Sequence, residues 1–365
     1  MLTRTRKLPL RLHNSCLVAY AEPMAKNFEP VRIAIVGCGA IAELGHLPGA
    51  LVSDAVVVTT LVDRDLERAR MLAARFGVPH VESEIAAAAD HAEAAVVALP
   101  PHLHRIAAET LFGRGLHVLM EKPLAASVVD SIAITAAARA AGRVLVLAMP
   151  RRFAPSSRYL KAAVASGMIG QITRYITSSG TSEAWPAQSP YMFDVATSGG
   201  GALIGNACHD IDLLQWLLGP IDKISYSSDS EVQLEANCLL ECRMQNGAVA
   251  NIEVSRTRTL ANTIRIEGEH ATLVAPLIGT AVQVIPAGID PGEIAPFHGV
   301  SPDFAILMGA QLDAFAASCR GEASAEVDGA EGLAMLELIE RCYASTQPLV
   351  LPWDRPVALQ GVLGS

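Results

Sequence analysis

Two side chains in this sequence stand in motifs where a proton can be held or moved. Lys122 lies near the end of HVLMEKP (117–123), and His209 lies within GGGALIGNACHDIDLLQW (199–216). A histidine titrates near neutral pH. An ammonium group stabilises the negative charge that develops on an oxygen, and it can relay the proton. The two residues are therefore suited to proton transfer at a hydroxyl or carbonyl group.

A glycine motif supplies the second chemical component. GCGAIA (37–42) directly follows the apolar run VRIAIVG (31–37). Gly37 permits a tight turn, Gly39 lets a pyrophosphate approach the backbone, and Ala42 allows close helix packing. The phosphates then lie at a helix N-terminus, where free N–H groups favour negative charge. We expect a dinucleotide at this turn, held by Gly37, Gly39, Ala40 and Ile41.

Asp63 distinguishes between the two nicotinamide dinucleotides. It ends the second apolar run, 21 residues beyond Ala42, as the dinucleotide pattern requires. Its carboxylate accepts hydrogen bonds from ribose hydroxyls and repels a 2′-phosphate, which favours NAD. Arg64 follows immediately and is suited to a 2′-phosphate, so NADP remains an alternative.

The elements that must position these groups alternate regularly up to Met149. Helical windows cover 66–76, 102–112 and 125–141. Short apolar runs separate them: VRIAIVG (31–37), AVVVTTLVD (55–63), AAVVALP (94–100), HVLMEKP (117–123) and RVLVLAM (143–149). Continuous apolar strands between helices indicate a doubly wound parallel sheet covered on both faces. Ligands of such sheets bind at the carboxyl ends of the strands, where Lys122 lies.

The pattern changes after residue 149. A helix over 156–166 precedes alternating strands, and the turn QNG (245–247) predicts a hairpin. Two late helices cover 304–319 and 329–345. We therefore predict an α/β Rossmann domain at 31–150 and an α+β domain at 151–365.

Several motifs together resemble the Gfo/Idh/MocA oxidoreductases. They are GCGAIAELGHLPG, ALPPHLH, MEKPL, RRFAP, GGGALIGNACHDID and DGAEGLAMLELIERCYAS, which extend over nearly the whole chain after residue 30. The resemblance implies a Rossmann domain joined to an open, mostly antiparallel sheet whose face covers the nicotinamide. It also implies that the domain at 151–365 serves substrate binding and oligomerisation. It implies hydride transfer at a carbinol or ketone carbon of a sugar, cyclitol or sugar nucleotide, with NAD or NADP.

The resemblance also implies roles for single residues. The lysine of the EKP motif, here Lys122, is catalytic in that family and is also expected to contact the cofactor. Pro123 is a candidate for a cis bond. Glu121 is implied to line the nicotinamide pocket. Pro100 and His104 resemble the segment that covers the cofactor after the fourth strand.

The segment around His209 departs from the family pattern. On a helix over 201–218, positions 205, 209, 212 and 216 share one face, while Leu203, Ala207, Ile211, Leu214 and Leu218 form an apolar face. The family's D-x-G-x-H-x-x-D pattern keeps His209, implied as general base, and Asp212, for which a structural role is favoured. Gly205 replaces the first aspartate. Asn206, beside it, is a candidate substrate ligand.

The missing carboxylate has more than one interpretation. In one interpretation, a larger or anionic substrate occupies the space at Gly205, and Lys122 and His209 suffice for turnover. Alternatively the chain binds a dinucleotide as a non-catalytic regulator or scaffold, or it cleaves glycosides with the help of NAD. Retained oxidoreductase chemistry is favoured because Lys122, His209 and the glycine motif occur together.

Aromatic and basic residues are further candidates for contacts with the substrate or the cofactor. Trp185 and Tyr191 are suited to stacking on a sugar ring, although their loop fits a subunit contact equally well. Arg151 and Arg152 are candidates for an anionic substrate or the cofactor, with surface ion pairs as the alternative.

Composition excludes other classes. The net charge of −9 disfavours nucleic-acid binding, and no apolar run approaches the roughly 18 residues of a membrane span. Seven scattered cysteines favour reduced thiols in the cytoplasm. Cys238 and Cys242 fit two core residues on one strand face better than a metal pair, so no metal is expected. A homodimer or homotetramer is expected.

The first thirty residues are basic at the front, and they lack the apolar segment of a secretory signal. We expect residues 1–30 to be a disordered extension. An upstream start before Met24 or an amphipathic targeting segment are the alternatives.

Overall fold

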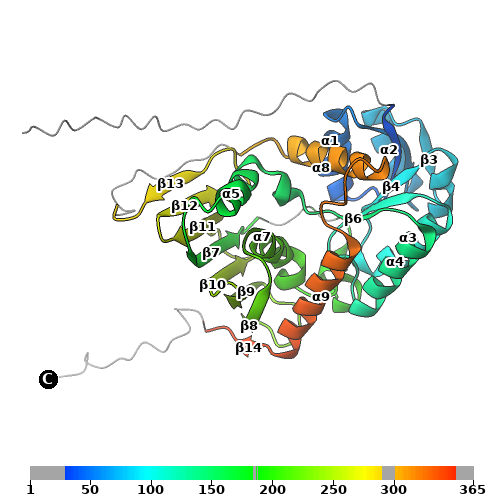
Figure 1. Cartoon of the computed structure of the whole chain (residues 1–365). Helices are drawn as coiled ribbons and strands as arrows, with labels where there is room; N and C mark the ends of the chain where they lie inside the picture. Colours follow the sequence, from blue (N-terminus) through cyan, green and yellow to red (C-terminus); the bar gives the residue numbers. More distant parts are fainter. Residues whose placement is uncertain (1–28, 184–185, 187, 290–300, 351–365) are drawn as a thin grey trace, which may run out of the picture.

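The computed structural model describes residues 29–183, 186, 188–289 and 301–350. The prediction of a disordered extension at 1–30 falls almost entirely outside these ranges. Two sheets lie side by side, with the long helix α9 (Gly329–Ala344) between them (Figure 1). Within the described ranges, no helix combines the length and apolarity that crossing a membrane requires.

The first sheet is the predicted doubly wound one. Six parallel strands have the order β3-β2-β1-β4-β5-β6. They are β1 (Val31–Val36), β2 (Val56–Val62), β3 (His80–Glu82), β4 (Ala94–Val97), β5 (His117–Met120) and β6 (Leu145–Leu147). Every residue of β4 is buried, as expected for a strand covered on both faces. The strand order reverses between β1 and β4, and doubly wound sheets bind ligands at the carboxyl ends of the strands at such a point.

Helices cover this sheet with boundaries close to those predicted. They are α1 (Leu47–Leu51), α2 (Leu66–Phe76), α3 (His104–Gly113) and α4 (Val128–Ala141). The prediction for α4 began three residues early, because Ser127 caps the helix by accepting a hydrogen bond from the backbone N–H of Asp130. A π-helical turn, Ala42–His46, joins the glycine motif to α1.

The second sheet is mixed and mostly antiparallel. Its order is β13-β12-β11-β7-β10-β9-β8-β14, and only the pairs β7–β10 and β8–β14 are parallel. The strands are β7 (Ile172–Gly180), β8 (Ile221–Ser228), β9 (Asn237–Met244), β10 (Val249–Ser255), β11 (Thr263–Gly268), β12 (Ala271–Pro276), β13 (Gln283–Pro286) and β14 (Gln347–Pro348). The predicted hairpin at 245–247 connects β9 to β10.

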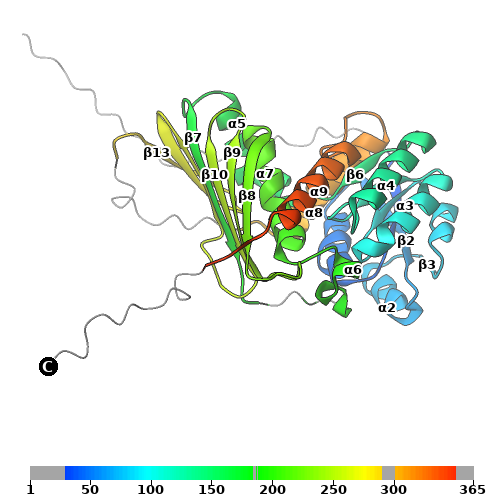
Figure 2. The same ribbon diagram turned by 90° about the horizontal axis from the view of Figure 1, so that it is seen from below.

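One face of this sheet packs against helices. The helices α5 (Pro155–Ala165) and α7 (Cys208–Leu218) lie on it (Figure 2). The predicted apolar face of the 201–218 helix is buried in this core. Cys238 and Cys242 are buried there too, and the described residues contain no cluster that could hold a metal.

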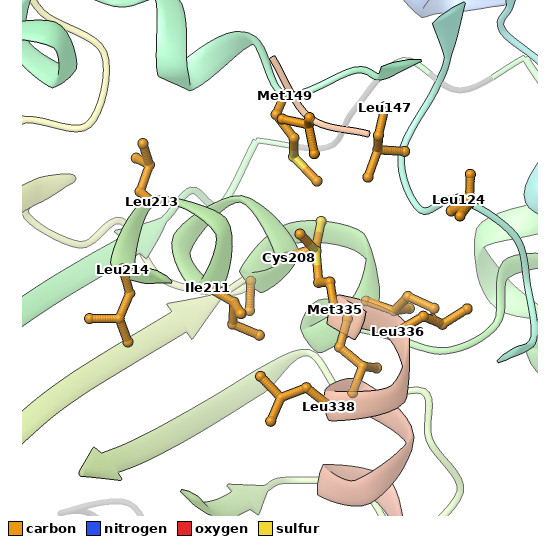
Figure 3. Packing of buried hydrophobic residues seen from close by; sticks show 14 of the residues in the cluster. Leu124, Leu147, Met149, Cys208, Ile211, Leu213, Leu214, Met335, Leu336 and Leu338 are labelled. Atoms are coloured by element: carbon orange, nitrogen blue, oxygen red, sulfur yellow. The ribbon is translucent and has the colours of Figure 1, made fainter. Parts of the chain in front are cut away.

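The two halves share a continuous core. Figure 3 shows Cys208 and Ile211 of α7 and Met335 of α9 close to Leu147 and Met149 of the first half. This packing fixes the edge of the parallel sheet against the helix that carries His209.

The end of the chain returns to the first half. Helix α8 (Phe304–Cys319) crosses α1 so closely that a Cβ added to Gly49 would lie 2.6 Å from Met308 Cβ. Its residues Leu312 and Phe315 are buried in the same cluster as β1. The segment 151–365 therefore contains a helix that packs on the dinucleotide-binding half, which the sequence order alone did not indicate.

Candidate active site

The glycine turn has the geometry of a phosphate cradle. Gly37 has φ +99°, and a Cβ there would lie 2.5 Å from the backbone oxygen of Ala98, so only glycine fits. A Cβ added to Gly39 would have no neighbour within 4 Å, so its backbone borders open space. Ala40 and Ile41 begin the helix that follows, and its N-terminal N–H groups face this space. These residues fit the pyrophosphate of a dinucleotide.

Asp63 lies against this turn. One carboxylate oxygen accepts a hydrogen bond from the backbone N–H of Cys38 at 2.7 Å, and the other accepts from Asp65 N–H at 2.9 Å. These bonds fix the carboxylate at the end of β2, beside the phosphate cradle. Arg64 is exposed, and within the described ranges it forms no ion pair.

Glu121 is the buried acid of the EKP motif. It is 8% exposed, and one oxygen lies 2.8 Å from Nε2 of His46 while the other accepts from the backbone N–H of Lys122 at 3.2 Å. Burial alone would raise the pKa of Glu121, but His46 and the Lys122 charge together lower it. The acid is therefore ionised. His46, which the sequence analysis did not identify, belongs to the GHLPG segment and lies in the π-helical turn.

Lys122 extends from the first half to the second. The Lys122–Pro123 bond is cis, as the resemblance implied. The ammonium Nζ donates to the backbone oxygen of Gly205 at 2.5 Å. Gly205 lies in a second π-helical turn, Leu203–Ala207, which leads into α7. A π turn interrupts the regular helical hydrogen-bond ladder, and here it lies where the lysine contacts the helix.

His209 stands next to two cations. The ring is partly buried, and its Nδ1 has no hydrogen-bond partner among the described residues. Desolvation, then the charges of Lys122 and Arg151, hold the pKa of His209 well below its usual range. The imidazole is therefore neutral near pH 7 and can accept a proton from a hydroxyl group.

Asp212 and Arg152 bind one another instead of facing the cleft. The Arg152 guanidinium donates to both carboxylate oxygens of Asp212, at 2.7 and 3.0 Å, and also to Glu331 of α9. Arg152 is 4% exposed, and these bonds link α7 to α9. This ion pair favours a structural role for Arg152 over the predicted contact with substrate. Arg151 pairs with the buried Asp210 at 2.8 Å.

The segment after β4 contacts the EKP loop. His104 is fully buried, and its ring nitrogens lie 2.8 Å from the backbone oxygen of Leu99 and 3.0 Å from that of Pro123. It joins the loop after β4 to the EKP loop, at the edge where the sequence predicts the cofactor. Pro100 is partly exposed and begins a short 3-10 turn at the same edge.

The space expected at Gly205 is filled. A Cβ on Gly205 would overlap Nη2 of Arg256, a residue that directly follows β10. Arg256 donates from Nε to the side-chain oxygen of Asn206 at 2.7 Å and from Nη2 to the backbone oxygen of Gly201 at 3.0 Å. The amide of Asn206, predicted to bind substrate, thus positions Arg256. Sequence reasoning missed Arg256 because nothing in its own segment marks it.

Tyr191 lies near the same groups. It occurs in the 3-10 turn Pro190–Phe193. Burial and the Glu121 carboxylate raise the pKa of Tyr191, and the Arg256 charge opposes them. The loop therefore brings an aromatic ring close to both halves of the site. Trp185 lies outside the described residues.

Comparison with known proteins agrees with this geometry. The family model for an oxidoreductase family with an NAD-binding Rossmann fold matches residues 31–149, and the model for the GFO/IDH/MocA C-terminal domain matches residues 157–274. Inositol 2-dehydrogenase 1 of Saccharopolyspora erythraea is 29% identical over 348 residues, which cover 91% of this chain and 99% of that protein. D-glucoside 3-dehydrogenase of Escherichia coli is 25% identical over 59% of this chain and 62% of that protein.

Solved structures share the fold. Levoglucosan dehydrogenase in complex with NADH has a TM-score of 0.76 and 20% identity, over 86% of this chain and 96% of that chain. The WlbA dehydrogenase of Bordetella pertussis, in complex with NADH and UDP-GlcNAcA, has a TM-score of 0.73 and 24% identity, over 87% and 95%. With the Rossmann turn, the EKP loop and the mixed sheet all in place, the chain belongs to the Gfo/Idh/MocA family of NAD-dependent oxidoreductases.

Proposed function

We propose that this protein oxidises a secondary alcohol of a polyhydroxylated ring, or reduces the corresponding ketone, with Lys122 and His209 holding the proton. The proposal rests on a contact between the two halves of the molecule. The Lys122 ammonium donates to the backbone oxygen of Gly205, which lies one helical turn before His209. The relatives named as inositol and glucoside dehydrogenases support a sugar or cyclitol as substrate.

The cofactor site fits the residues present. Gly37, Gly39, Ala40 and Ile41 would hold the pyrophosphate, and Asp63 would accept from the adenosine ribose, which favours NAD over NADP. Pro100 and Glu121 would border the nicotinamide. Bound NAD supplies the hydride acceptor for alcohol oxidation.

The protein's own groups then handle the proton. Neutral His209 accepts the hydroxyl proton of the substrate, because its pKa is held low by burial and by the neighbouring cations. The Lys122 ammonium stabilises the negative charge on the substrate oxygen. Glu121, fixed by His46, holds the backbone of Lys122 in place.

A substrate panel tests this proposal. Wild-type protein with NAD is mixed with inositols, aldoses, glucosides, sugar acids and nucleotide sugars, and reduction is followed at 340 nm. We expect at least one compound to reduce NAD with saturation kinetics, and His209→Gln to lower its kcat by about 100-fold or more. Tight NADH binding with no reduction by any compound would instead indicate a dinucleotide-binding regulatory protein.

Two further properties belong to the same proposal. We expect a homodimer or homotetramer, supported by the face of the mixed sheet opposite α5 and α7, on which the described chain places no helix (Figure 2). Analytical ultracentrifugation measures this, and a monomer at micromolar concentration would contradict it. Six described cysteines are free thiols, which supports a reducing compartment such as the cytoplasm.

A further inference from the structure

Arg256 brings a positive charge into the site from the second sheet. It directly follows β10, and its guanidinium reaches the π-helical turn that contains Gly205. The backbone oxygen of that same glycine accepts from the Lys122 ammonium. Two cations from different halves of the molecule therefore converge on one residue, a turn away from His209.

The partners that hold Arg256 are neutral. They are the amide oxygen of Asn206 and the backbone oxygen of Gly201. No described carboxylate forms an ion pair with Arg256. Its Nη1 donates to no described acceptor, so part of the guanidinium remains available.

A buried acid that attracts Arg256 forms no direct ion pair with it. Oε1 of Glu235 accepts from the backbone N–H of Leu203 at 2.7 Å and from the hydroxyl of Tyr343 at 3.1 Å, while its Oε2 has no hydrogen-bond partner among the described residues. Burial raises the pKa of Glu235 and lowers that of Arg256, and the attraction between the two charges opposes both shifts. A partly buried cation that no described carboxylate contacts directly gains from a partner that brings its own negative charge.

The shape of the donor selects the kind of anion. A guanidinium presents its N–H groups in a planar fork, which matches the two oxygens of a carboxylate. In the proposed reaction, Lys122 contacts the substrate oxygen at the carbon that is oxidised or reduced. Arg256 is therefore the cation that can bind a second group of the substrate. We propose that Arg256 recognises a carboxylate on the substrate and that the enzyme acts on a hydroxy acid, such as a sugar acid or a hydroxylated cyclic acid.

This inference rests on the proposed dehydrogenase function, but binding can be measured apart from turnover. The first experiment titrates the enzyme–NADH complex calorimetrically with D-galacturonate, D-galactose and D-galactose 6-phosphate. We expect the carboxylate to bind at least about 30-fold more tightly than the neutral sugar, as for a buried charge pair. Equal affinity for acid and neutral sugar would overturn the proposal, and tighter binding of the phosphate would overturn the assignment to a carboxylate.

The second experiment substitutes Arg256 in the enzyme. Arg256→Met should reduce the acid-to-neutral affinity ratio to within about threefold of unity. Arg174→Met removes an exposed charge from β7 and should keep the wild-type ratio. NADH affinity within threefold of wild type reports that each variant is folded. If Arg256→Met fails to fold, Arg256→Lys, which retains the charge but loses the fork, should still lower the ratio at least fivefold. An unchanged ratio in a folded Arg256 variant contradicts the proposal.

Measurements of turnover distinguish failure of the dehydrogenase function from failure of the carboxylate site. If acids bind in an Arg256-dependent way and no compound reduces NAD, the dehydrogenase function fails while the carboxylate site stands. If neutral sugars reduce NAD as well as acids do, the function stands and the carboxylate site fails.

Discussion

The guanidinium of Arg256 occupies the space that a side chain at position 205 would need. The chain thus has a cation from the segment that follows β10 at the position where the family pattern has an acid on the helix. The site keeps a proton acceptor and an ammonium group, but its third charge is reversed in sign.

Restoring an acid at this position should cancel the cation. In Gly205→Asp, the new carboxylate meets the flexible end of Arg256, and the two pair. We expect kcat/KM for a hydroxy acid to fall at least about tenfold, because one charge-assisted hydrogen bond to the substrate is lost. Steady-state rates at 340 nm measure this. Gly205→Ser, which adds a small neutral group, is the control and should lose less; equal losses in both variants would count against the ion pair.

The titration of His209 gives a prediction about pH. Burial and the charges of Lys122 and Arg151 lower its pKa, so the ring should remain neutral when the pH falls below 6.5. Lys122→Met removes one of these charges and should move the titration to higher pH. NMR of isotope-labelled histidine, with His209→Gln for assignment, measures both. A ring that titrates at its ordinary value in the wild type would show that it is solvated.

The same shift affects stability. His209 binds a proton near pH 6.5 in the unfolded chain but only at lower pH in the folded protein. The free energy of unfolding therefore falls as pH decreases below about 6.5. Urea unfolding at pH 7 and pH 5 should show a smaller loss for His209→Gln than for the wild type. An identical loss in both proteins would contradict the depressed pKa.

The buried pair Arg152–Asp212 predicts a large loss of stability. Asp212→Ala leaves a 4% exposed guanidinium without its main partner, and this should lower the free energy of unfolding by about 3–5 kcal/mol. Glu109→Ala breaks the exposed pair with Arg105 and should cost less than about 1 kcal/mol. Chemical denaturation measures both values, and comparable losses would place Asp212 in a solvated environment.

The local parts of the site could be predicted from the sequence. GCGAIA and Asp63 lie at strand ends within one continuous unit, and the EKP motif places Lys122 at the same edge. Each of these motifs can be recognised within a short segment that ends a single strand. The doubly wound topology followed from the same alternation.

The parts that depend on distant contacts could not be predicted. Arg256 reaches Gly205 from the segment after β10. His46 binds Glu121 across 75 positions, and Arg152 joins α7 to α9. Helix α8 packs against α1 although more than 250 residues separate them. Periodicity identifies a face of an element, but it does not identify what that face will meet.

The central claim is that Lys122 acts on the reacting oxygen of the substrate and contributes little to the affinity for the cofactor. The direct measurement compares NADH affinity and kcat for wild type and Lys122→Met with the same substrate. The account predicts an NADH dissociation constant within threefold of wild type and a kcat lower by about 100-fold or more. Near-normal kcat in Lys122→Met would contradict it.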